Sequence, residues 1–197
     1  MLRSLAMRVF NRYYPMVLLL AAVAVVASAA LSAAGSQAPA SRSASPAQSA
    51  MERGKYFVLV QDCNGCHTPF KNGEPDMTRM LSGHPQDITI TAAPKLPPGW
   101  AVSINDTNTA WSGPWGISFT TNLTPDRDTG IGGWTEDMFV KTIRNGKHLG
   151  GGRGLLAPMP WKMYSNLTDA DLKAIYAYLK TIPAIKNKVP SPMPAEK

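Results

Sequence analysis

The chain contains few residues that could build a metal or disulfide framework: two cysteines and three histidines among 197 residues. A structural zinc site normally takes four Cys or His ligands from two clusters, and the sequence offers no second cluster. No βαβ pattern surrounds the cysteines, as it would in a thioredoxin-like dithiol protein. The glycine-rich stretch 146–154 lacks the Lys-Ser or Lys-Thr ending of a phosphate-binding loop. These absences disfavour zinc modules, thioredoxin-like proteins and phosphate-loop enzymes.

A concentrated block of charge is also absent from the main part of the chain. The formal net charge is +7, from 20 Lys and Arg and 13 Asp and Glu, and Arg3, Arg8 and Arg12 lie in the N-terminal segment. The other basic residues are scattered and form neither a stripe nor a run. We therefore expect a generally solvated surface and no nucleic-acid partner, with a docking face for an acidic protein as the alternative.

The N-terminal segment has the composition of an export signal. Residues 1–14 are basic, and residues 16–34 contain no charged side chain. The uncharged run fits a cleaved signal peptide, and it is also long enough to span a bilayer. Because the arginines stay on the cytoplasmic side, both alternatives place the body in the periplasm. There it is either soluble or tethered to the inner membrane through residues 16–34.

Composition divides the rest of the chain into three parts. Residues 35–50 are mostly Ser, Ala, Pro and Gln, which bury little apolar surface, so we expect a flexible linker. Residues 51–183 contain the apolar patterns and the chemical motifs, and we expect one folded domain there. Residues 184–197 are rich in Pro and Lys and are expected to form a loose tail.

Both cysteines belong to one motif, Cys63-Asn64-Gly65-Cys66-His67. This is the Cys-x-x-Cys-His sequence that attaches a c-type haem. The two thiols, about one helical turn apart, can each add to a vinyl group of the porphyrin, and His67 can bind the iron as the proximal ligand. A redox dithiol, half of a zinc site and a structural disulfide are the alternatives. The adjacent histidine and the export signal favour haem attachment.

A sixth iron ligand is expected at Met159, which stands between Pro158 and Pro160. Each proline fixes its own φ angle and restricts the residue before it, so the methionine sits on a stiff backbone. A thioether held in this way suits coordination to iron. The chain offers other candidates for the position, namely Met77, Met80, Met138, Met163, His84 and His148.

Local patterns predict three helices and a long irregular stretch. We expect helices over residues 51–61, 135–146 and 168–182, the second and third capped by Thr135 and Thr168. Residues 68–118 are rich in Pro, Gly, Asn and Thr, with short strands expected at 87–92 and 99–104. This stretch contains three tryptophans, which we expect to cover the haem edge or to form a partner-docking patch: Trp100, Trp111 and Trp115.

The ordered set of motifs resembles the class I c-type cytochromes, above all the haem domains in cytochrome subunits of periplasmic membrane-bound dehydrogenases. The matching segments, spread over residues 51–183, are Gly54-Lys55-Tyr56, Asp62–Thr68, Asn122–Asp126, Thr129–Trp134, Pro158–Pro160, Leu167–Leu172 and Ile175–Leu179. The resemblance implies an all-α fold of the cytochrome c class I type. Its helices would wrap around one covalently bound haem, with residues 68–118 as a long Pro/Gly/Trp-rich loop insertion.

The resemblance also implies roles for residues that spacing alone does not assign. Ile131 and Trp134 would lie near the haem ring. Gly54 would meet Tyr176 or Tyr178 where the first and last helices cross. The relatives usually carry three haem domains, whereas this chain has one attachment motif.

The function implied is electron transfer without catalysis. The haem would cycle between Fe(II) and Fe(III) and carry single electrons from a dehydrogenase to an oxidase or another cytochrome. One alternative is a haem enzyme or gas sensor with a labile sixth site, in which His84 or His148 would assist. The other is a permanent cytochrome subunit of a dehydrogenase complex.

Overall fold

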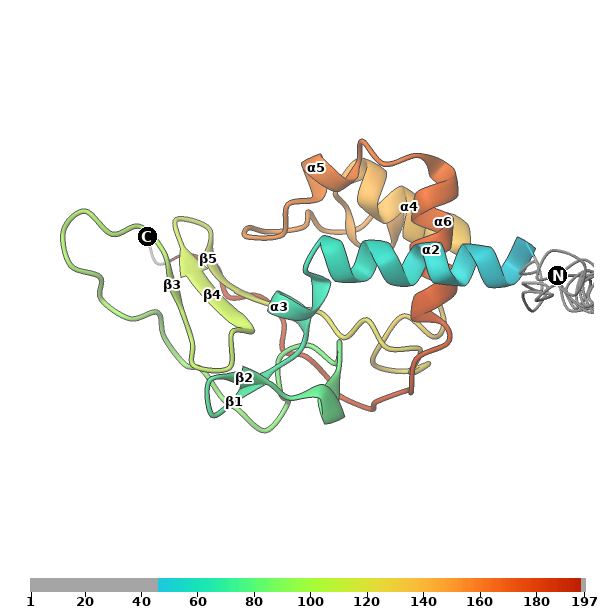
Figure 1. Ribbon diagram of the computed structural model, residues 1–197. Coiled ribbons are helices and arrows are strands. Elements are labelled where there is room, and N and C mark those ends of the chain that lie inside the picture. The colour runs from blue at the N-terminus through green and yellow to red at the C-terminus, as the bar shows by residue number, and fades with distance from the viewer. Residues whose placement is uncertain (1–45, 196–197) are drawn as a thin grey trace, which may run out of the picture. The chain divides into compact units, whose positions relative to one another are not determined.

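The structure is a computed structural model that describes residues 46–195. In this part of the chain the longer helices gather on one side, and short antiparallel strands lie on the other (Figure 1). The α-helices are α2 (Pro46–Val60), α3 (Cys63–His67), α4 (Glu136–Asn145), α5 (Trp161–Tyr164) and α6 (Asp169–Leu179). Two short 3-10 helices are η1 (Met77–Arg79) and η2 (His148–Gly150). The three helices predicted from the sequence are present, although α2 begins at Pro46.

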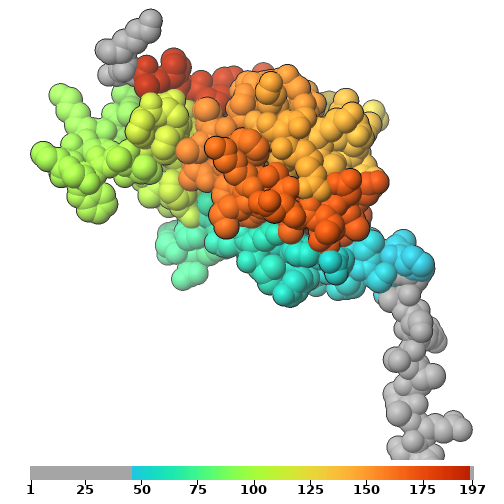
Figure 2. Space-filling view, turned by 90° about the horizontal axis from the view of Figure 1, so that it is seen from above, coloured from blue at the N-terminus to red at the C-terminus, as the bar shows by residue number. Residues whose placement is uncertain are grey.

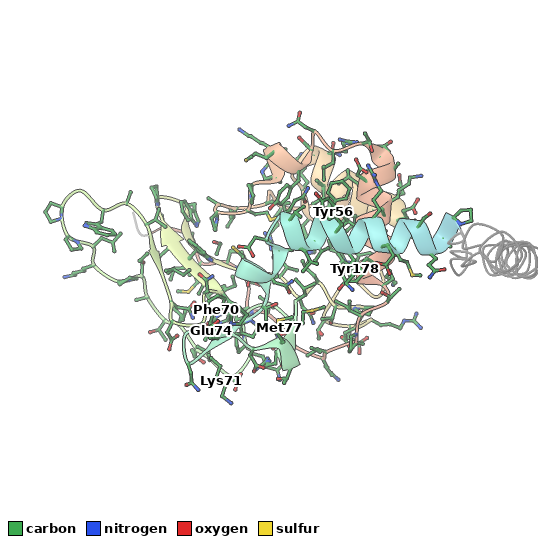
Figure 3. All side chains as sticks on the ribbon, in the orientation of Figure 1. Tyr56, Phe70, Lys71, Glu74, Met77 and Tyr178 are labelled. Atoms are coloured by element: carbon green, nitrogen blue, oxygen red, sulfur yellow. The ribbon has the colours of Figure 1, made fainter. Side chains whose placement is uncertain are left out.

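The crossing of α2 and α6 explains the glycine inside α2. A Cβ atom at Gly54 would stand 1.9 Å from the carbonyl oxygen of Ala174 and 2.9 Å from Cβ of Tyr178. Figure 3 places Tyr178 at this crossing. An ion pair joins the same helices, with Arg53 Nε 2.5 Å from Asp171 Oδ1. The two helices therefore approach more closely than any side chain at position 54 would allow.

The caps predicted for α4 and α6 are present. The Thr135 hydroxyl accepts a hydrogen bond from the Met138 amide, and Gly146 ends α4 in the left-handed region at φ 61°. The Thr168 hydroxyl accepts from the Asp171 amide at 3.2 Å. Helix α6 packs against both α2 and α4. The main core between them consists of Val58, Leu81, Ile131, Phe139, Ile143, Leu172, Ile175, Leu179 and Ile182.

The expectation of an all-α fold is wrong, because the stretch 68–118, together with Phe119, contains two antiparallel sheets. Figure 1 shows both. One pairs β1 (Phe70–Lys71) with β2 (Glu74–Pro75), and the other has the order β3 (Ser103–Ile104), β4 (Ala110–Gly113) and β5 (Gly116–Phe119).

The strands in this stretch have a physical cause. A stretch rich in Pro and Gly forms helices poorly, yet its buried backbone groups still need partners, and short ladders supply them. The turn between β4 and β5 uses Gly116 at φ 94°, where a side chain would be strained. Ser103–Ile104 lies inside the strand expected at 99–104, while the strand expected at 87–92 did not form.

The tail expected to be loose is instead bonded to the body through residue 193. Ile185 accepts from Asn122 Nδ2 at 2.8 Å, and the Ile117 and Met193 backbones exchange hydrogen bonds of 2.8 and 2.9 Å. In Figure 2 the red C-terminal segment runs along one edge of the molecule, from the orange helices to the yellow-green sheet region. It therefore connects the helical side to the sheet side.

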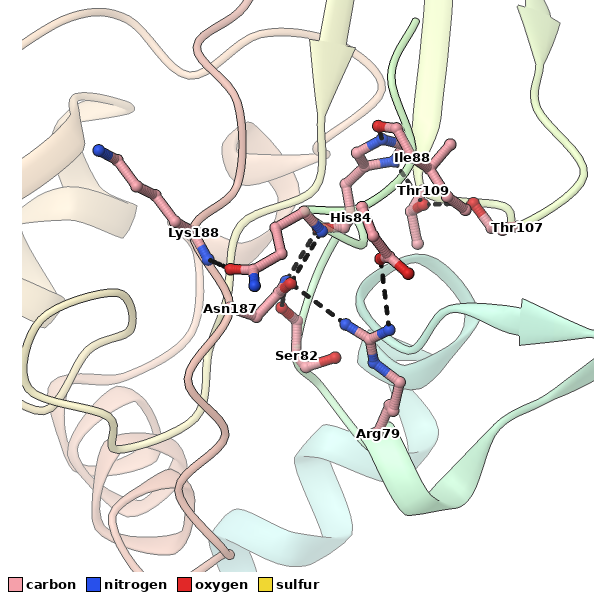
Figure 4. A network of polar contacts seen from close by, with 10 residues as sticks. Arg79, Ser82, His84, Ile88, Thr107, Thr109, Asn187 and Lys188 are labelled. Carbon is pink, nitrogen blue, oxygen red and sulfur yellow. Dashed lines mark hydrogen bonds and ion pairs between the residues drawn. The ribbon is translucent and has the colours of Figure 1, made fainter.

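A fully buried asparagine anchors this tail (Figure 4). Asn187 Nδ2 donates to the carbonyls of Ser82 and His84 at 2.7 and 2.8 Å. Its Oδ1 accepts from the Gln86 amide at 3.0 Å and from Arg79 Nη2 at 3.1 Å. One side chain thus satisfies four groups that lie 101 to 108 residues earlier in the chain.

Candidate functional site: an apolar cavity beside the Cys-x-x-Cys-His helix

Helix α3 carries both cysteines and the adjacent histidine. Asp62, at φ 52°, caps it, and its Oδ1 accepts from the Gly65 amide at 3.1 Å. Cys63 and Cys66 are three residues apart on this turn, so they share one side of the helix. Both are free thiols and partly buried.

The thiol environment is unlike that of a redox-active dithiol. Burial is the largest cause that raises the pKa of Cys63 to about 12, and the pKa of Cys66 is also raised by burial. Redox dithiols instead have an attacking thiol of lowered pKa, because the thiolate is the reactive form. Within residues 46–195, no group of three or more His, Cys, Asp or Glu side chains is placed to hold a metal ion.

His67 has one ring nitrogen engaged and one left over. Its Nδ1 lies 2.7 Å from the carbonyl oxygen of Thr121. A carbonyl only accepts, so Nδ1 carries the proton and Nε2 keeps its lone pair. Burial lowers the pKa of His67, which favours the same neutral form. This is how proteins commonly orient an imidazole that binds a metal through its other nitrogen.

The backbone around the motif is held by loops from far along the chain. The carbonyl of His67 accepts from the Gly83 amide at 2.8 Å. The carbonyl of Gly65 accepts from Asn108 Nδ2. Thr68, fully buried, accepts from the Leu81 amide at 2.9 Å through its hydroxyl. The loops of the 68–118 stretch thus fix the short helix on the body.

A cavity opens beside this helix, and its walls are mainly apolar. The space between the lining side chains, counted with the open mouth, is about 1280 Å³. The lining includes the motif residues Cys63, Cys66 and His67, the aromatic side chains Phe119, Trp134, Phe139 and Tyr164, and the aliphatic side chains Leu123, Leu156, Ile175 and Leu179. Large apolar concavities of this kind are typical of cofactor sites.

Met159 is a wall residue of the same cavity. It is partly buried, packs against the main core, and lies in the segment Leu156–Pro160, all of which lines the cavity. Its amide donates to the Leu156 carbonyl at 3.2 Å, so the segment forms a tight turn. The cavity therefore brings together Cys63, Cys66, His67, Trp134 and Met159, which the sequence singled out.

Other candidates lie elsewhere or differ in setting. Ile131 is fully buried in the main core and is not among the lining residues. His84 is fully buried between Thr109 and the Ile88 carbonyl, away from the cavity lining. His148 does line the cavity, edge-on to Trp134 at 5.3 Å between ring centroids. Met77, Met80, Met138 and Met163 do not line it.

Two features of the site escaped sequence reasoning. A second Pro-Met-Pro segment occurs at residues 192–194, and its methionine, Met193, packs against Ala110, Ile117 and Phe119 rather than lining the cavity. Ser118 donates from its hydroxyl to the Ala157 carbonyl in the Met159 segment at 2.6 Å. The repeated tripeptide was visible in the sequence, whereas no local pattern announces the Ser118 contact.

The residues around the cavity fit a covalently attached, iron-containing macrocycle. The fit rests on two free thiols on one turn, an imidazole with an open Nε2, apolar walls and a thioether in the wall. Zinc fits less well, because the described residues supply no tetrahedral set of ligands. Features of this kind are typical of c-type cytochromes.

Comparison with known proteins points to the same class. The chain is similar to cytochrome c subunits of dehydrogenases, which confirms the resemblance predicted from the sequence. It is 31% identical over 155 residues to the fructose dehydrogenase cytochrome subunit of Gluconobacter japonicus, covering 76% of this chain and 26% of that protein. It is 31% identical over 128 residues to the gluconate 2-dehydrogenase cytochrome c subunit of Pantoea cypripedii, covering 65% of this chain and 22% of that protein.

A third relative is the cytochrome c subunit of the quinone alcohol dehydrogenase of Gluconobacter oxydans, 29% identical over 144 residues, with 71% of this chain and 23% of that protein covered. The chain therefore spans about a quarter of the length of these relatives. No protein-family model matches the chain.

Proposed function

We propose that the protein is a mono-haem c-type cytochrome that carries single electrons between periplasmic redox proteins and is not itself an enzyme. The observation that carries this proposal is a cavity lined both by residues of the Cys63–His67 helix and by Met159. Similarity to cytochrome c subunits supports the same class. One attachment motif in the sequence argues for one covalent haem c.

In this proposal Cys63 and Cys66 hold the cofactor through two thioether bonds, and His67 Nε2 and the Met159 sulfur bind its iron. A haem held in this way supplies one-electron chemistry between Fe(II) and Fe(III). Thr121 keeps the proton on Nδ1 of His67 and so leaves Nε2 free for the iron.

The walls of the cavity tune this chemistry. Trp134 and its apolar neighbours keep water away from the site, and Ile131 supports this wall from the core. The thioether of Met159 and the apolar surroundings both disfavour additional positive charge, so they raise the reduction potential. A haem iron held by both His67 and Met159 would have no open site for oxygen or peroxide.

Export would bring the chain to the compartment in which it works. Residues 1–34 would act as a signal peptide or as a membrane anchor through residues 16–34, and residues 35–45 would form part of the linker. These segments lie outside the described residues. No helix within residues 46–195 is long and apolar enough to cross a bilayer.

The electron partners proposed are a dehydrogenase on one side and an oxidase or another cytochrome on the other. The relatives are subunits of fructose, gluconate and alcohol dehydrogenases by name, which supports a dehydrogenase as donor. A permanent place in such a complex is the alternative to a mobile carrier. Co-purification of a dehydrogenase with a tagged chain at high salt would favour the permanent subunit, and its absence would favour the carrier.

Covalent haem attachment gives the first test. The chain is expressed with a c-type cytochrome maturation system, and the denatured protein is examined for haem on a gel and by its pyridine haemochrome spectrum. We expect one haem per chain, and we expect the double variant Cys63→Ala/Cys66→Ala to lose the covalent haem. Absence of covalent haem from the intact chain would overturn the proposal.

A haem enzyme or gas sensor is the second candidate, and one observation favours it. His148 lines the cavity, and burial lowers its pKa, so a neutral imidazole is available there as an acid or base. Such a protein needs an open or labile sixth position. Exposure of the reduced intact protein to carbon monoxide separates the two, because ready binding would favour the enzyme or sensor and no binding the carrier.

A further inference from the structure

The three-stranded sheet touches the Met159 segment through one buried serine. Ser118, on β5, is 8% exposed and lines the cavity. Its hydroxyl oxygen lies 2.6 Å from the carbonyl oxygen of Ala157, two residues before Met159. The Met159 amide in turn donates to Leu156, so the segment between Leu156 and Met159 is closed on itself. A displacement of Ala157 would therefore move the methionine.

The direction of the hydrogen bonds at Ser118 is set by its neighbours. Trp115 Nε1 can only donate, and it lies 3.3 Å from the serine oxygen. The single hydroxyl proton can then go to the Ala157 carbonyl at 2.6 Å or to the Trp111 carbonyl at 3.4 Å. The proton goes to Ala157, because 2.6 Å lies within the usual range for O–H···O hydrogen bonds and 3.4 Å lies outside it. Trp115 Nε1 thus donates to the Ser118 hydroxyl, and the hydroxyl donates to the Ala157 carbonyl.

The strand that carries Ser118 is itself held from behind. The amides and carbonyls of Ile117 and Met193 exchange two hydrogen bonds. A Cβ atom at Gly116 would stand 2.1 Å from the Met193 carbonyl oxygen, so the tail backbone lies directly against the strand. On its other edge β5 pairs with β4 along four residue pairs. The support for Ser118 is therefore a strand bonded on both sides.

We propose that Ser118 is a positioning residue for the sixth iron ligand, and that the sheet β3–β5 is a support for the Met159 segment. The inference rests on the proposed function, because it takes Met159 as that ligand. It assigns a role to part of the Trp-rich stretch that is longer than a small cytochrome needs. The sheet limits how often the thioether can leave the iron.

The rate at which an added ligand replaces Met159 measures this role. At high imidazole concentration the replacement in the ferric, haem-loaded full chain is limited by departure of the thioether, so stopped-flow absorbance reports that departure. Ser118→Ala removes the hydrogen bond to Ala157 and should raise the limiting rate roughly fivefold, the factor that corresponds to about 1 kcal/mol for one hydrogen bond. Ser118→Thr keeps the hydroxyl and should restore a rate within twofold of the wild type.

A matched control comes from the same sheet. Ser112, on β4, pairs with Ile117, so its side chain lies on the opposite face from Ser118. Ser112→Ala should leave the replacement rate unchanged. Met159→Ala has no thioether that must leave first, so it should bind imidazole at a rate that does not level off at high imidazole concentration. If Met159→Ala and the wild type bind equally fast, the ligand assignment itself fails, and the role of Ser118 fails with it.

The proposal on Ser118 is overturned separately if Met159→Ala binds fast while Ser118→Ala keeps the wild-type limiting rate. A merely stabilising serine would give that result, with a lower melting temperature and an unchanged rate. If Ser118→Ala does not accumulate with haem, the same replacement rate is measured in Trp115→Phe, which lacks the indole N–H that donates to Ser118. A rise of at least twofold would then support the proposal, and an unchanged rate would overturn it.

Discussion

The tripeptide Pro-Met-Pro occurs twice in this chain, in two regions that are built differently. Met159 lies in the wall of the cavity, against the helical core of α2, α4 and α6. Met193 lies on the small sheet, packed against Ala110, Ile117 and Phe119. Each proline fixes its own φ angle in both segments, so the tripeptide alone does not decide which sulfur can serve as a ligand.

The difference lies in what surrounds each methionine. The Met159 amide bonds within its own turn, and the side chain lines the apolar space beside His67. The Met193 backbone bonds to Ile117 in both directions, and its side chain fills a gap in a second, smaller core. A stiff Pro-Met-Pro segment is thus a general device for fixing a methionine, and the tertiary contacts assign its use.

The largest expected effect concerns the helical region. Gly54→Ala would force a Cβ atom to 1.9 Å from the Ala174 carbonyl, so α2 and α6 would have to separate. We expect a loss of more than about 3 kcal/mol in the free energy of unfolding, measured by denaturant titration, and little haem-loaded protein. At Gly151 an added Cβ atom would meet no atom within 4 Å apart from its chain neighbours, so Gly151→Ala should hardly change the unfolding free energy. Equal behaviour of the two variants would contradict the close crossing.

The next effect separates the two methionines directly. Met159→Ala should lower the midpoint potential by an amount on the order of 100 mV, part of the roughly 0.8 V range that axial ligands set, and should let the ferrous protein bind carbon monoxide. Met193→Ala should lower the unfolding free energy by about 1–3 kcal/mol through lost packing and leave the potential almost unchanged. Potentiometric titration measures the midpoint potential of both variants. A large fall in Met193→Ala with none in Met159→Ala would contradict the different roles of the two methionines.

The sheet region depends more on buried polar groups than the helical region does. Asn187→Ala leaves the Ser82 and His84 carbonyls and two donors without their partner, at a cost of about 2–4 kcal/mol in unfolding free energy. Lys188→Ala keeps the hydrogen bond from the amide of residue 188 to Gln86 Oε1, so it should change the unfolding free energy little. Thermal unfolding of the two variants measures the difference, and a neutral Asn187→Ala would show that the tail contributes little.

The smallest effect expected is a pH dependence of the unfolding free energy that comes from His84 in the sheet region. His84 Nε2 donates to the Ile88 carbonyl, its Nδ1 accepts from the Thr109 hydroxyl, and burial lowers its pKa. The unfolded chain then binds the extra proton more readily, so the unfolding free energy should fall as the pH drops below about 6.5, by at most about 1.4 kcal/mol per pH unit. His84→Gln should show a flatter dependence in denaturant titrations at several pH values. An identical slope would contradict this role of His84.

Local signals predicted the helical region well. The Thr135 and Thr168 caps and the Gly146 end of α4 depend on residues a few positions apart. The close approach of α6 at Gly54 joins distant residues, and it was the family resemblance that implied it. Short patterns also singled out the cysteine motif and Met159, which the structure places along one cavity. These features can be read from sequence because each follows from the geometry of one or two turns.

The sheet region could not be predicted in the same way. Strands β4 and β5 have only four residues each and mix large side chains with small ones such as Ala110, Ser112 and Gly116, so they lack the longer run of β-branched residues that indicates a strand. The contacts of Asn187 join residues more than 100 positions apart, and only the folded chain brings them together. The expectation of an all-α fold therefore failed where the strands are only two to four residues long and give little pattern in the sequence.

The proposed ligation of the iron by Met159, rather than by Met193, can be tested directly. In the ferrous protein with ¹³C-labelled methionine methyl groups, a methyl held over the haem plane resonates far upfield, because the ring current of the macrocycle shields it. We predict one such signal in the wild type, its loss in Met159→Ala and its retention in Met193→Ala. Persistence of the signal in Met159→Ala, or its disappearance in Met193→Ala alone, would contradict the account.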